Sequence, residues 1–505
     1  MKAPLLRRFG AAFNALRGQE PPRRRMRAVF AGARVDRNFQ DWLASALPAD
    51  DEIRGDLRML KIRGRQLSRD NSIAIAFLNT LSNNVLGEHG IALQSQFRQG
   101  QDLDETLNDE VESGFEDFSQ SPFVDGGMSM EEGDDLMLRT VATDGEIFVR
   151  MYDGFPNEHG FALQLVDSDQ VDEMDSVYGG PNRPEVRMGV EVTPYGKPLA
   201  YRIHQDPRSP NGFSFRPERV PAADVLHLGR RRRANQTRCV TWFHGVMTDM
   251  HLLEGYLESE VIAARNHAAA CIIFEDMEAT PPGADEAQEE KTDASGTERQ
   301  IELAPGVAVD APSGKKVSSW APTHPNDSAP DFVKMWEYRI ASGLGCSRVM
   351  LVNDVKDGNF SSQRIAIQAD RKRWRKDQQW LIRDLKRKIA HRWFMNAARR
   401  RLFGSRSVEL ATNPGRLPFA WQPPTWEYVS PLEDMQTRVL ELQYRLTSPQ
   451  IVGAEQGRDA REILDQWKQI QEYAAARGVT LAPETIPPSI TGEKRHGNDD
   501  EPAPS

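Results

Sequence analysis

The 505-residue chain contains only three cysteines, Cys239, Cys271 and Cys346, and none of them lies in a Cys-x-x-Cys pair. An odd number of widely spaced thiols does not indicate a disulfide framework, and the paired ligands typical of a zinc site are missing. We therefore expect the chain to fold in a reducing, cytoplasmic environment without a structural metal.

The sequence also lacks the short patterns that accompany common catalytic chemistry. No GxxxxGK[ST] loop is present, which excludes a P-loop ATPase, and neither HExxH nor GxSxG occurs. His244 and His251 stand seven residues apart and are compatible with a metal pair, but surface or interface positions are commoner for such histidines. Acidic pairs such as Asp134-Asp135 favour helix starts over nuclease ligands. We expect no catalytic site, no metal and no cofactor.

Long apolar runs are missing as well, since nothing approaches the roughly 18 residues that cross a bilayer. The first residues, MKAPLLRRFGAAFNALRG, lack the uninterrupted apolar core of a signal peptide. They fit a basic arm that a partner orders, or a membrane-surface helix, and we favour the arm. The net charge of -10 argues against a protein that grips nucleic acid, because grip requires phosphate neutralisation. It does not argue against a protein along which DNA slides.

Apolar periodicity predicts several helices. Apolar residues recur at helical intervals over 50–86, about 241–270, 331–344 and 362–401. Ser430-Pro431 and Ser448-Pro449 are typical helix starts, because serine caps the first turn and proline suits its first position. A last helix is expected over 459–477, where Gly478 can end it.

Strand patterns lie mainly between about 135 and 230. Five short runs there are rich in β-branched and aromatic residues and are separated by turn residues: EIFVRMY, FALQLVD, GVEV, PLAYRIH and DVLHLG. Short strands are also expected within 300–320. The acidic segment 278–298 and the segment 346–360 are expected to be loops. The fold class is therefore α+β.

Two basic clusters stand out against the acidic total. Residues 364–401 contain fourteen arginines and lysines against three aspartates. This cluster fits a solvated helix face, or a contact with nucleic acid or an acidic neighbouring subunit. Residues 230–233 fit an exposed loop or a contact between subunits equally well. The candidate residues for subunit or DNA contacts are Arg230, Arg231, Arg232, Arg233, Arg371, Lys372, Arg373 and Arg375.

Four segments, in one order over about 50–480, resemble the portal proteins of lambda-type tailed phages. They are RGRQLSRDN (63–71) with NNVLG (83–87), VPAADVLHL (220–228) with QTR (236–238), IASGLG (340–345) with NFSSQR (359–364), and YVSP (428–431) with GRD (457–459). Departures from the family pattern are Leu86 and an extra residue before Gly90, Cys239 in place of glycine, Phe360 in place of tyrosine, and Ser430 in place of aspartate.

The resemblance implies the portal fold and a division of the chain into nine parts. These are a basic, partly disordered N-terminal arm (1–40), an α+β wing (41–240), a stem helix (241–272), a clip (273–330), a second stem helix (331–345), a tunnel loop (346–360), a basic helix with returning wing elements (361–429), a helical crown (430–480) and a disordered tail (481–505).

The resemblance also implies a structural role rather than an enzymatic one. Portal subunits assemble into a ring, typically of about twelve copies, around a channel for double-stranded DNA. The implied partners are further copies of the chain, DNA, the terminase large subunit, a head-tail adaptor, and the major capsid and scaffold proteins, with no membrane. The implied location is the portal vertex of the virion, after assembly in the host cytoplasm.

The tunnel loop supplies the candidate DNA contacts, which are Val352, Asn353, Asp354, Lys356 and Asn359. Ring symmetry would multiply each lumen charge, and salt-dependent affinity rises steeply with the number of phosphate contacts. We therefore expect a mostly acidic or neutral lumen, with Lys356 as a transient contact whose replacement by alanine alters packaging or DNA retention but leaves the ring intact.

Two other functions remain compatible with the sequence. A nuclease or recombinase would use the acidic pairs and the basic helix, and it predicts metal-dependent cleavage by the purified protein. A monomeric nucleic-acid-binding adaptor built on 364–401 predicts tight, salt-sensitive DNA binding without a ring.

Overall fold

The computed structural model describes residues 46–100, 102–180, 183–204, 217–268, 272–276, 315–319, 329–354, 360–407, 412, 417–426, 431–455 and 460–479. The chain divides into two units, Met1–Glu52 and Ile53–Ser505, and all the packing below belongs to the second. The predictions for the N-terminal arm, the acidic segment 278–298 and the tail lie outside the described residues, as do Cys271, Lys356 and Asn359.

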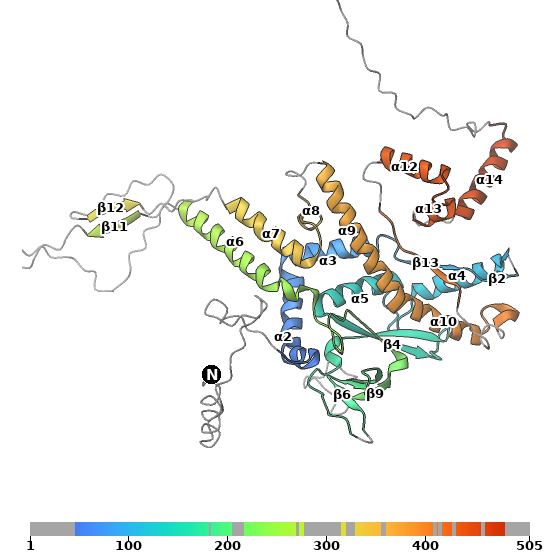
Figure 1. The fold of residues 1–505 in the computed structure, drawn as a ribbon, viewed down its shortest axis with the longest axis horizontal. Helices are drawn as coiled ribbons and strands as arrows, with labels where there is room; N and C mark the ends of the chain where they lie inside the picture. The colour runs from blue at the N-terminus through green and yellow to red at the C-terminus, as the bar shows by residue number, and fades with distance from the viewer. Residues whose placement is uncertain are drawn as a thin grey trace, which may run out of the picture. The chain divides into compact units, whose positions relative to one another are not determined.

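Groups of helices and groups of short strands follow one another along the chain (Figure 1). The helices are α2 (Ala49–Asp70), α3 (Ser72–Val85), α4 (Glu105–Gln120), α5 (Met130–Asp144), α6 (Met247–Ala268), α7 (Ala329–Leu344), α8 (Arg348–Val352), α9 (Phe360–Leu381), α10 (Arg387–Arg399), α12 (Pro431–Gln443), α13 (Pro449–Glu455) and α14 (Ala460–Ala476). The strands are β1 (Ala92–Ser95), β2 (Arg98–Gln99), β3 (Asp102–Leu103), β4 (Glu146–Asp153), β5 (Phe161–Val166), β6 (Glu185–Arg187), β7 (Val190–Val192), β8 (Pro198–Ile203), β9 (Glu218–Pro221), β10 (Val225–Gly229), β11 (Ile272–Asp276), β12 (Lys315–Ser319) and β13 (Phe419–Gln422).

Two antiparallel sheets of the second unit pack face to face. One has the order β10-β4-β5 and the other the order β6-β7-β8-β9. Phe148 and Val225 from the first sheet lie in one buried cluster with Val190, Tyr201 and Val220 from the second. Successive side chains of a strand point to opposite faces of its sheet, so every second residue of a strand can face the other sheet. The five runs that the sequence predicts as strands are all strands in the structure.

The three-stranded sheet is buried on its other face too, against helices. Ile147, Val149 and Met151 of β4 belong to the main core together with residues of α3, α5, α9 and α10. Burial on both faces explains why EIFVRMY reads as an almost continuous apolar run rather than an alternating one. The pair β1-β13 joins residues 92–95 to residues 419–422, so a distant part of the chain returns to this body.

Specific residues end and begin the helices of the core. The single helix expected over 50–86 is divided at Asn71, whose side chain accepts hydrogen bonds from the backbone N–H groups of Ile73 and Ala74 at 3.1 Å. This is the geometry of an N-cap, and it turns α2 into α3. Gly145 ends α5 with φ of 100°, and a Cβ there would stand 2.3 Å from the carbonyl carbon of Val240. No other residue fits that close approach.

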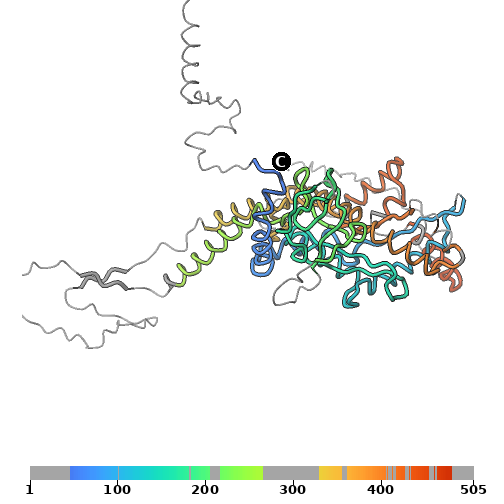
Figure 2. Tube along the Cα trace, turned by 90° about the horizontal axis from the view of Figure 1, so that it is seen from below, coloured from blue at the N-terminus to red at the C-terminus, as the bar shows by residue number. Residues whose placement is uncertain are grey.

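The helices α6 and α7 run side by side (Figures 1 and 2). The ring centroids of Tyr256 and Phe332 are 4.8 Å apart, and Arg339 donates to Asp249 at 2.7 Å. The helix predicted from about residue 241 begins later, because a 3₁₀ turn, Trp242–Gly245, precedes it. Every helix of the described ranges is too short or too polar to span a membrane.

The basic helix predicted over 362–401 is present but interrupted. A π-helical segment, Ile382–Lys386, lies between α9 and α10. It buries Lys386 against Asp134 of α5, and both side chains are almost fully enclosed. A wider turn of this kind rotates the following residues and is often found where a helix must present side chains in a particular direction.

Candidate functional site

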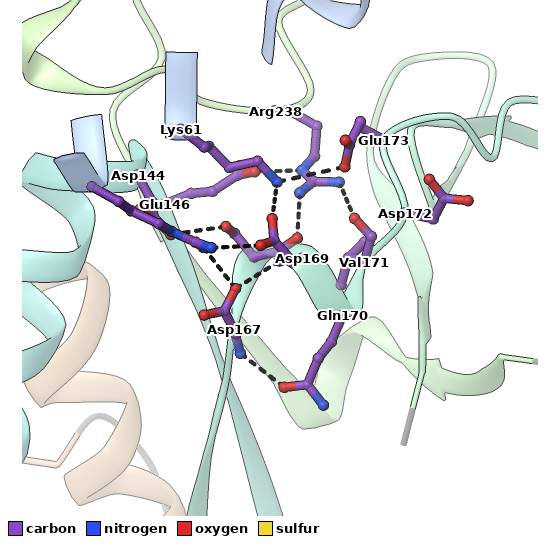
Figure 3. Close-up of polar contacts among 12 residues, drawn as sticks. Lys61, Asp144, Glu146, Asp167, Asp169, Gln170, Val171, Asp172, Glu173 and Arg238 are labelled. Carbon is purple, nitrogen blue, oxygen red and sulfur yellow. Dashed lines mark hydrogen bonds and ion pairs between the residues drawn. The ribbon is translucent and has the colours of Figure 1, made fainter. Parts of the chain in front are cut away.

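Arg238 forms the centre of a buried polar network (Figure 3). Its guanidinium donates from Nε to Oε1 of Glu146 at 2.5 Å, and its remaining donors reach three backbone carbonyls. These are the carbonyls of Val171 at 2.9 Å, Met188 at 2.7 Å and Ser168 at 3.1 Å. A planar group with five donors can join several segments at once, and Arg238 thereby joins β4, the turn after β5 and the turn between β6 and β7.

Glu146 accepts hydrogen bonds on both carboxylate oxygens. Oε2 lies 2.7 Å from Nε2 of His227 and accepts from the backbone N–H of Cys239 at 2.8 Å. Burial would raise the pKa of Glu146, but the charge of Arg238 and the hydrogen bond with His227 lower it to about 2. The carboxylate is therefore charged at neutral pH.

Glu146, His227 and Cys239 are also close enough to offer three ligand atoms to a metal ion. The donor set fits poorly, because the carboxylate is already saturated and a buried guanidinium stands against it. Burial and the charge of Glu146 raise the pKa of the Cys239 thiol, which disfavours the thiolate that a zinc ion needs. These three residues therefore form a structural hydrogen-bond cluster in the interior rather than a metal site.

Helix α2 contributes a second layer of charge to the network. Lys61, almost fully enclosed, contacts Asp169 at 2.5 Å, and Arg65 donates to Asp144 at 2.5 Å and to Asp169 at 2.6 Å. Burial raises the pKa of Asp144 despite the opposing charge of Arg65, while Lys61 and Arg65 lower the pKa of Asp169. Two cations four residues apart therefore hold the turn after β5 against α2.

The loop that carries Arg238 is closed by another residue of the QTR segment. Oε1 of Gln236 accepts hydrogen bonds from the backbone N–H groups of Arg232 at 2.7 Å and Arg233 at 3.0 Å. Its Nε2 donates to the carbonyl of Arg238 at 2.8 Å. The 236–238 segment of the family resemblance is thus a folding element rather than a surface site.

The predicted contact residue Arg230 is partly buried, with 30% of its side chain exposed, and its contacts lie within its own chain. Its guanidinium lies over the neighbouring rings of Trp242 and Trp380, 4.5 and 4.6 Å from their centroids, and donates to Asp377 at 2.6 Å. Arg373 is also partly buried, and it contacts the carbonyl of Leu344 and stacks over Trp374. Burial lowers the pKa of Arg373. Both arginines therefore have partners within the described chain, and both keep part of their side chain exposed.

The other candidate cations take different places. Arg371 and Arg375 lie over the ring of Trp426, at 5.8 and 5.7 Å from its centroid. Arg232 contacts the ring of His244 at 3.0 Å. Arg231, Arg233 and Lys372 are exposed. The eight candidates therefore do not form one surface.

The described start of the predicted tunnel loop is anchored rather than free. Arg348 contacts Glu337 at 2.7 Å and Asp354 at 2.8 Å, so the carboxylate of Asp354 has a partner within its own chain. Asn353 ends α8 in the left-handed conformation, with φ of 55°. The helix α8 itself was not predicted from the sequence. Val352, the last residue of α8, is exposed.

The network around Arg238 was missed by sequence reasoning. Arg238 and Arg65 lie in segments quoted for the family resemblance, but Lys61 and Glu146 carry no local signal. A buried charge is recognisable only when its partner is known, and Glu146 is 92 residues away from Arg238 in sequence.

Comparison with known proteins decides the family. A sequence model described as phage portal protein, lambda family, matches residues 35–378, which is more than half of the 505 residues. The chain belongs to the lambda family of phage portal proteins. Members of this family are structural components of the virion rather than enzymes, which agrees with the sequence prediction.

This portal protein is 30% identical over 452 residues to a probable portal protein of Halomonas phage phiHAP-1, and the match covers 87% of the chain and 85% of the relative. Among solved structures, it is similar to the neck of a native gene transfer agent (GTA) particle computed with C12 symmetry, at 12% identity and a TM-score of 0.41. That match covers 78% of this chain and 90% of the other. The neck of an empty GTA particle computed with C6 symmetry has 13% identity and a TM-score of 0.41, covering 75% and 88%.

Proposed function

We propose that this portal protein forms the portal vertex ring of a tailed phage. In this proposal DNA passes through the channel of the ring, inward when terminase packages it and outward at ejection. The outer end of the ring receives the head-completion and tail proteins. The family match supports the proposal as a whole, and the exposed surface of α6 and α7 supports the formation of a ring.

Helices α6 and α7 leave many apolar side chains exposed in a single subunit. They are Leu252, Leu257, Val261 and Ile262 on α6, and Phe332, Met335 and Tyr338 on α7. Exposed apolar surface of this extent usually marks an interface. A head-to-tail contact repeated around an axis would cover it and close into a ring.

The proposed parts follow the elements. Helices α6 and α7 would be the stem, and the antiparallel pair β11-β12 would lie in the clip between them. The end of α8 and the loop after it would line the channel, with Val352, Asn353, Asp354, Lys356 and Asn359 as the contact candidates. Helices α12, α13 and α14 would form the crown.

Negative-stain imaging and mass photometry of the purified full chain test the proposal. We expect rings with a central hole, typically of about twelve copies. The variant L257D/V261D should shift the protein to single polypeptides, because it places charge on the stem interface. Ser259→Asp is the matched control, since it adds a charge to the same helix without removing an apolar side chain. Wild-type protein that stays monomeric at high concentration would overturn the proposal.

A further inference from the structure

A groove runs along the outer side of the α9–α10 region, next to β10. It consists of two adjoining cavities of about 860 and 630 Å³ that share His227, Gly229, Arg231 and Lys388 as lining residues. The π-helical segment Ile382–Lys386 contributes Arg383 and Asp384 to its wall. The groove is thus a continuous feature built from the strand edge and the interrupted basic helix.

The groove carries an excess of positive charge. Its two carboxylates are already engaged within the chain, because Asp377 pairs with Arg230 and Asp384 pairs with Arg383. Two further lining cations, Arg373 and Arg392, also pair with carboxylates of the chain. Five lining cations are exposed and have no ion-pair partner within the described part of the chain: Lys197, Arg231, Lys376, Arg387 and Lys388. Uncompensated cations along a groove attract an acidic partner.

The opposite side of α10 faces another helix. Trp393 is fully buried there, with ring centroids 5.1 Å from Phe115 and 6.1 Å from Phe118 of α4. A helix turns by about 100° per residue, so Arg387, Lys388 and His391 lie roughly opposite Trp393. The groove and α4 therefore lie on opposite sides of α10.

Helix α4 presents only acidic charge to the outside. Its inner face is formed by Leu107, Val111, Phe115 and Phe118, all buried. Its outer face carries the exposed carboxylates Asp109, Glu110, Glu116 and Asp117, and the helix contains no lysine or arginine. None of these four carboxylates has an ion-pair partner in the described ranges. The α4–α10 layer thus has an acidic flank and a basic flank that face away from each other.

We propose that the basic groove receives the acidic outer face of α4 from the next copy of the chain. The inference rests on the proposed ring, because it names the two surfaces through which neighbouring subunits of that ring would be aligned. A cyclic assembly needs two different, complementary patches on opposite flanks of one subunit, and this layer supplies such a pair. Opposed charge also disfavours the same flank meeting itself, which guides assembly toward the head-to-tail contact.

Nucleic acid is the other polyanion that the groove could attract. The acidic flank argues for a second copy, because it provides a complementary surface on the same chain. The chain as a whole carries a net charge of -10, which opposes a general attraction to DNA. Binding of a DNA duplex to the groove is therefore an alternative outcome of the test.

Charge reversal on both flanks tests the inference. The groove variant K376E/K388E and the helix variant E110K/D117K are each measured by mass photometry and negative stain at 0.15 M NaCl. We expect each to raise the concentration for half-maximal ring formation by about tenfold or more. The variant that combines all four substitutions again has opposite charges on the two flanks. It should return the concentration for half-maximal ring formation to within about threefold of wild type. Arg58→Glu, an exposed change on α2 that does not line the groove, is the control.

The outcomes separate this inference from the proposed function. Wild-type protein without rings overturns the proposed function and the inference together. Wild-type rings that both reversals leave unchanged overturn the inference alone, as does a combination that fails to restore assembly. Loss of binding to a short DNA duplex by K376E/K388E with rings intact would assign the groove to nucleic acid instead. Thermal melting checks folding. If K376E/K388E fails to fold, K376Q/K388Q replaces it, and if E110K/D117K fails to fold, E110Q/D117N replaces it.

Discussion

The guanidinium of Arg238 lies 2.5 Å from the carboxylate of Glu146, and both side chains are completely enclosed by the subunit. A buried ion pair gains attraction at the cost of desolvating both charges, so its presence alone says little about net stability. The removal of one partner is different, because the other charge is then left in the interior without compensation. Arg238 also donates to three backbone carbonyls, so its removal would leave unpaired acceptors in the turn after β5 and in the turn between β6 and β7.

Arg238→Ala should therefore lower the free energy of unfolding by about 3–5 kcal/mol. Chemical denaturation followed by tryptophan fluorescence measures the change. Lys372→Ala, at an exposed position, should change stability by no more than about 0.5 kcal/mol. Equal effects of the two substitutions would show that Arg238 is not a structural centre.

The pH dependence of stability should report on Glu146. Its pKa is about 2 in the folded chain, below its ordinary value of 4.5. A lowered folded-state pKa stabilises the fold above the unfolded pKa, and this contribution is lost as the pH falls from about 4.5 toward 2. The difference in stability between wild type and Glu146→Gln should be largest at neutral pH and shrink in that acidic window. A difference that stays constant from pH 6 to pH 3 would contradict the assignment.

Much of the fold follows from patterns that are local in sequence. The run EIFVRMY and its neighbours became strands because β-branched and aromatic residues bounded by turns have few other packed conformations. Helix starts at Pro431 and Pro449 were also predictable, since the Ser-Pro pairs supply a cap and a preset φ. The break at Asn71 was missed, because apolar periodicity continues across it and only the cap geometry separates the two helices.

The candidate site was less predictable, for a physical reason. Arg230 and Arg373 read as free surface charge in a basic cluster, yet both are partly buried against aromatic rings and acceptors from other parts of the chain. Burial of an arginine depends on tertiary partners such as Trp242 and Asp377, which local patterns do not reveal. The basic groove likewise exists only after β10 and the interrupted helix are brought together.

Two glycines of α2 should respond oppositely to alanine. A Cβ on Gly64 would stand 2.4 Å from the carbonyl oxygen of Thr143, whereas nothing lies within 4 Å of a Cβ on Gly55. Gly64→Ala should therefore separate α2 from the end of α5 and destabilise the chain by about 1–3 kcal/mol. Gly55→Ala should stabilise it by about 0.5–1 kcal/mol, because alanine is the better helix former. Thermal melting of both variants checks the prediction, and destabilisation by both would contradict it.

The pair of Lys386 and Asp134 offers a double-mutant test of the π-helical segment. Both side chains are almost fully enclosed, and burial raises the pKa of Asp134 even though the charge of Lys386 opposes the shift. Lys386→Met or Asp134→Leu alone leaves one buried charge without a partner and should cost about 3–5 kcal/mol.

The combination D134L/K386M removes both charges and should recover most of that loss, because an apolar pair of similar volume avoids the desolvation of two ions. Chemical denaturation of the four proteins gives the coupling energy directly. Additive losses in the double variant would show that the two residues do not act as a pair, and that the wider turn is held by the surrounding apolar contacts.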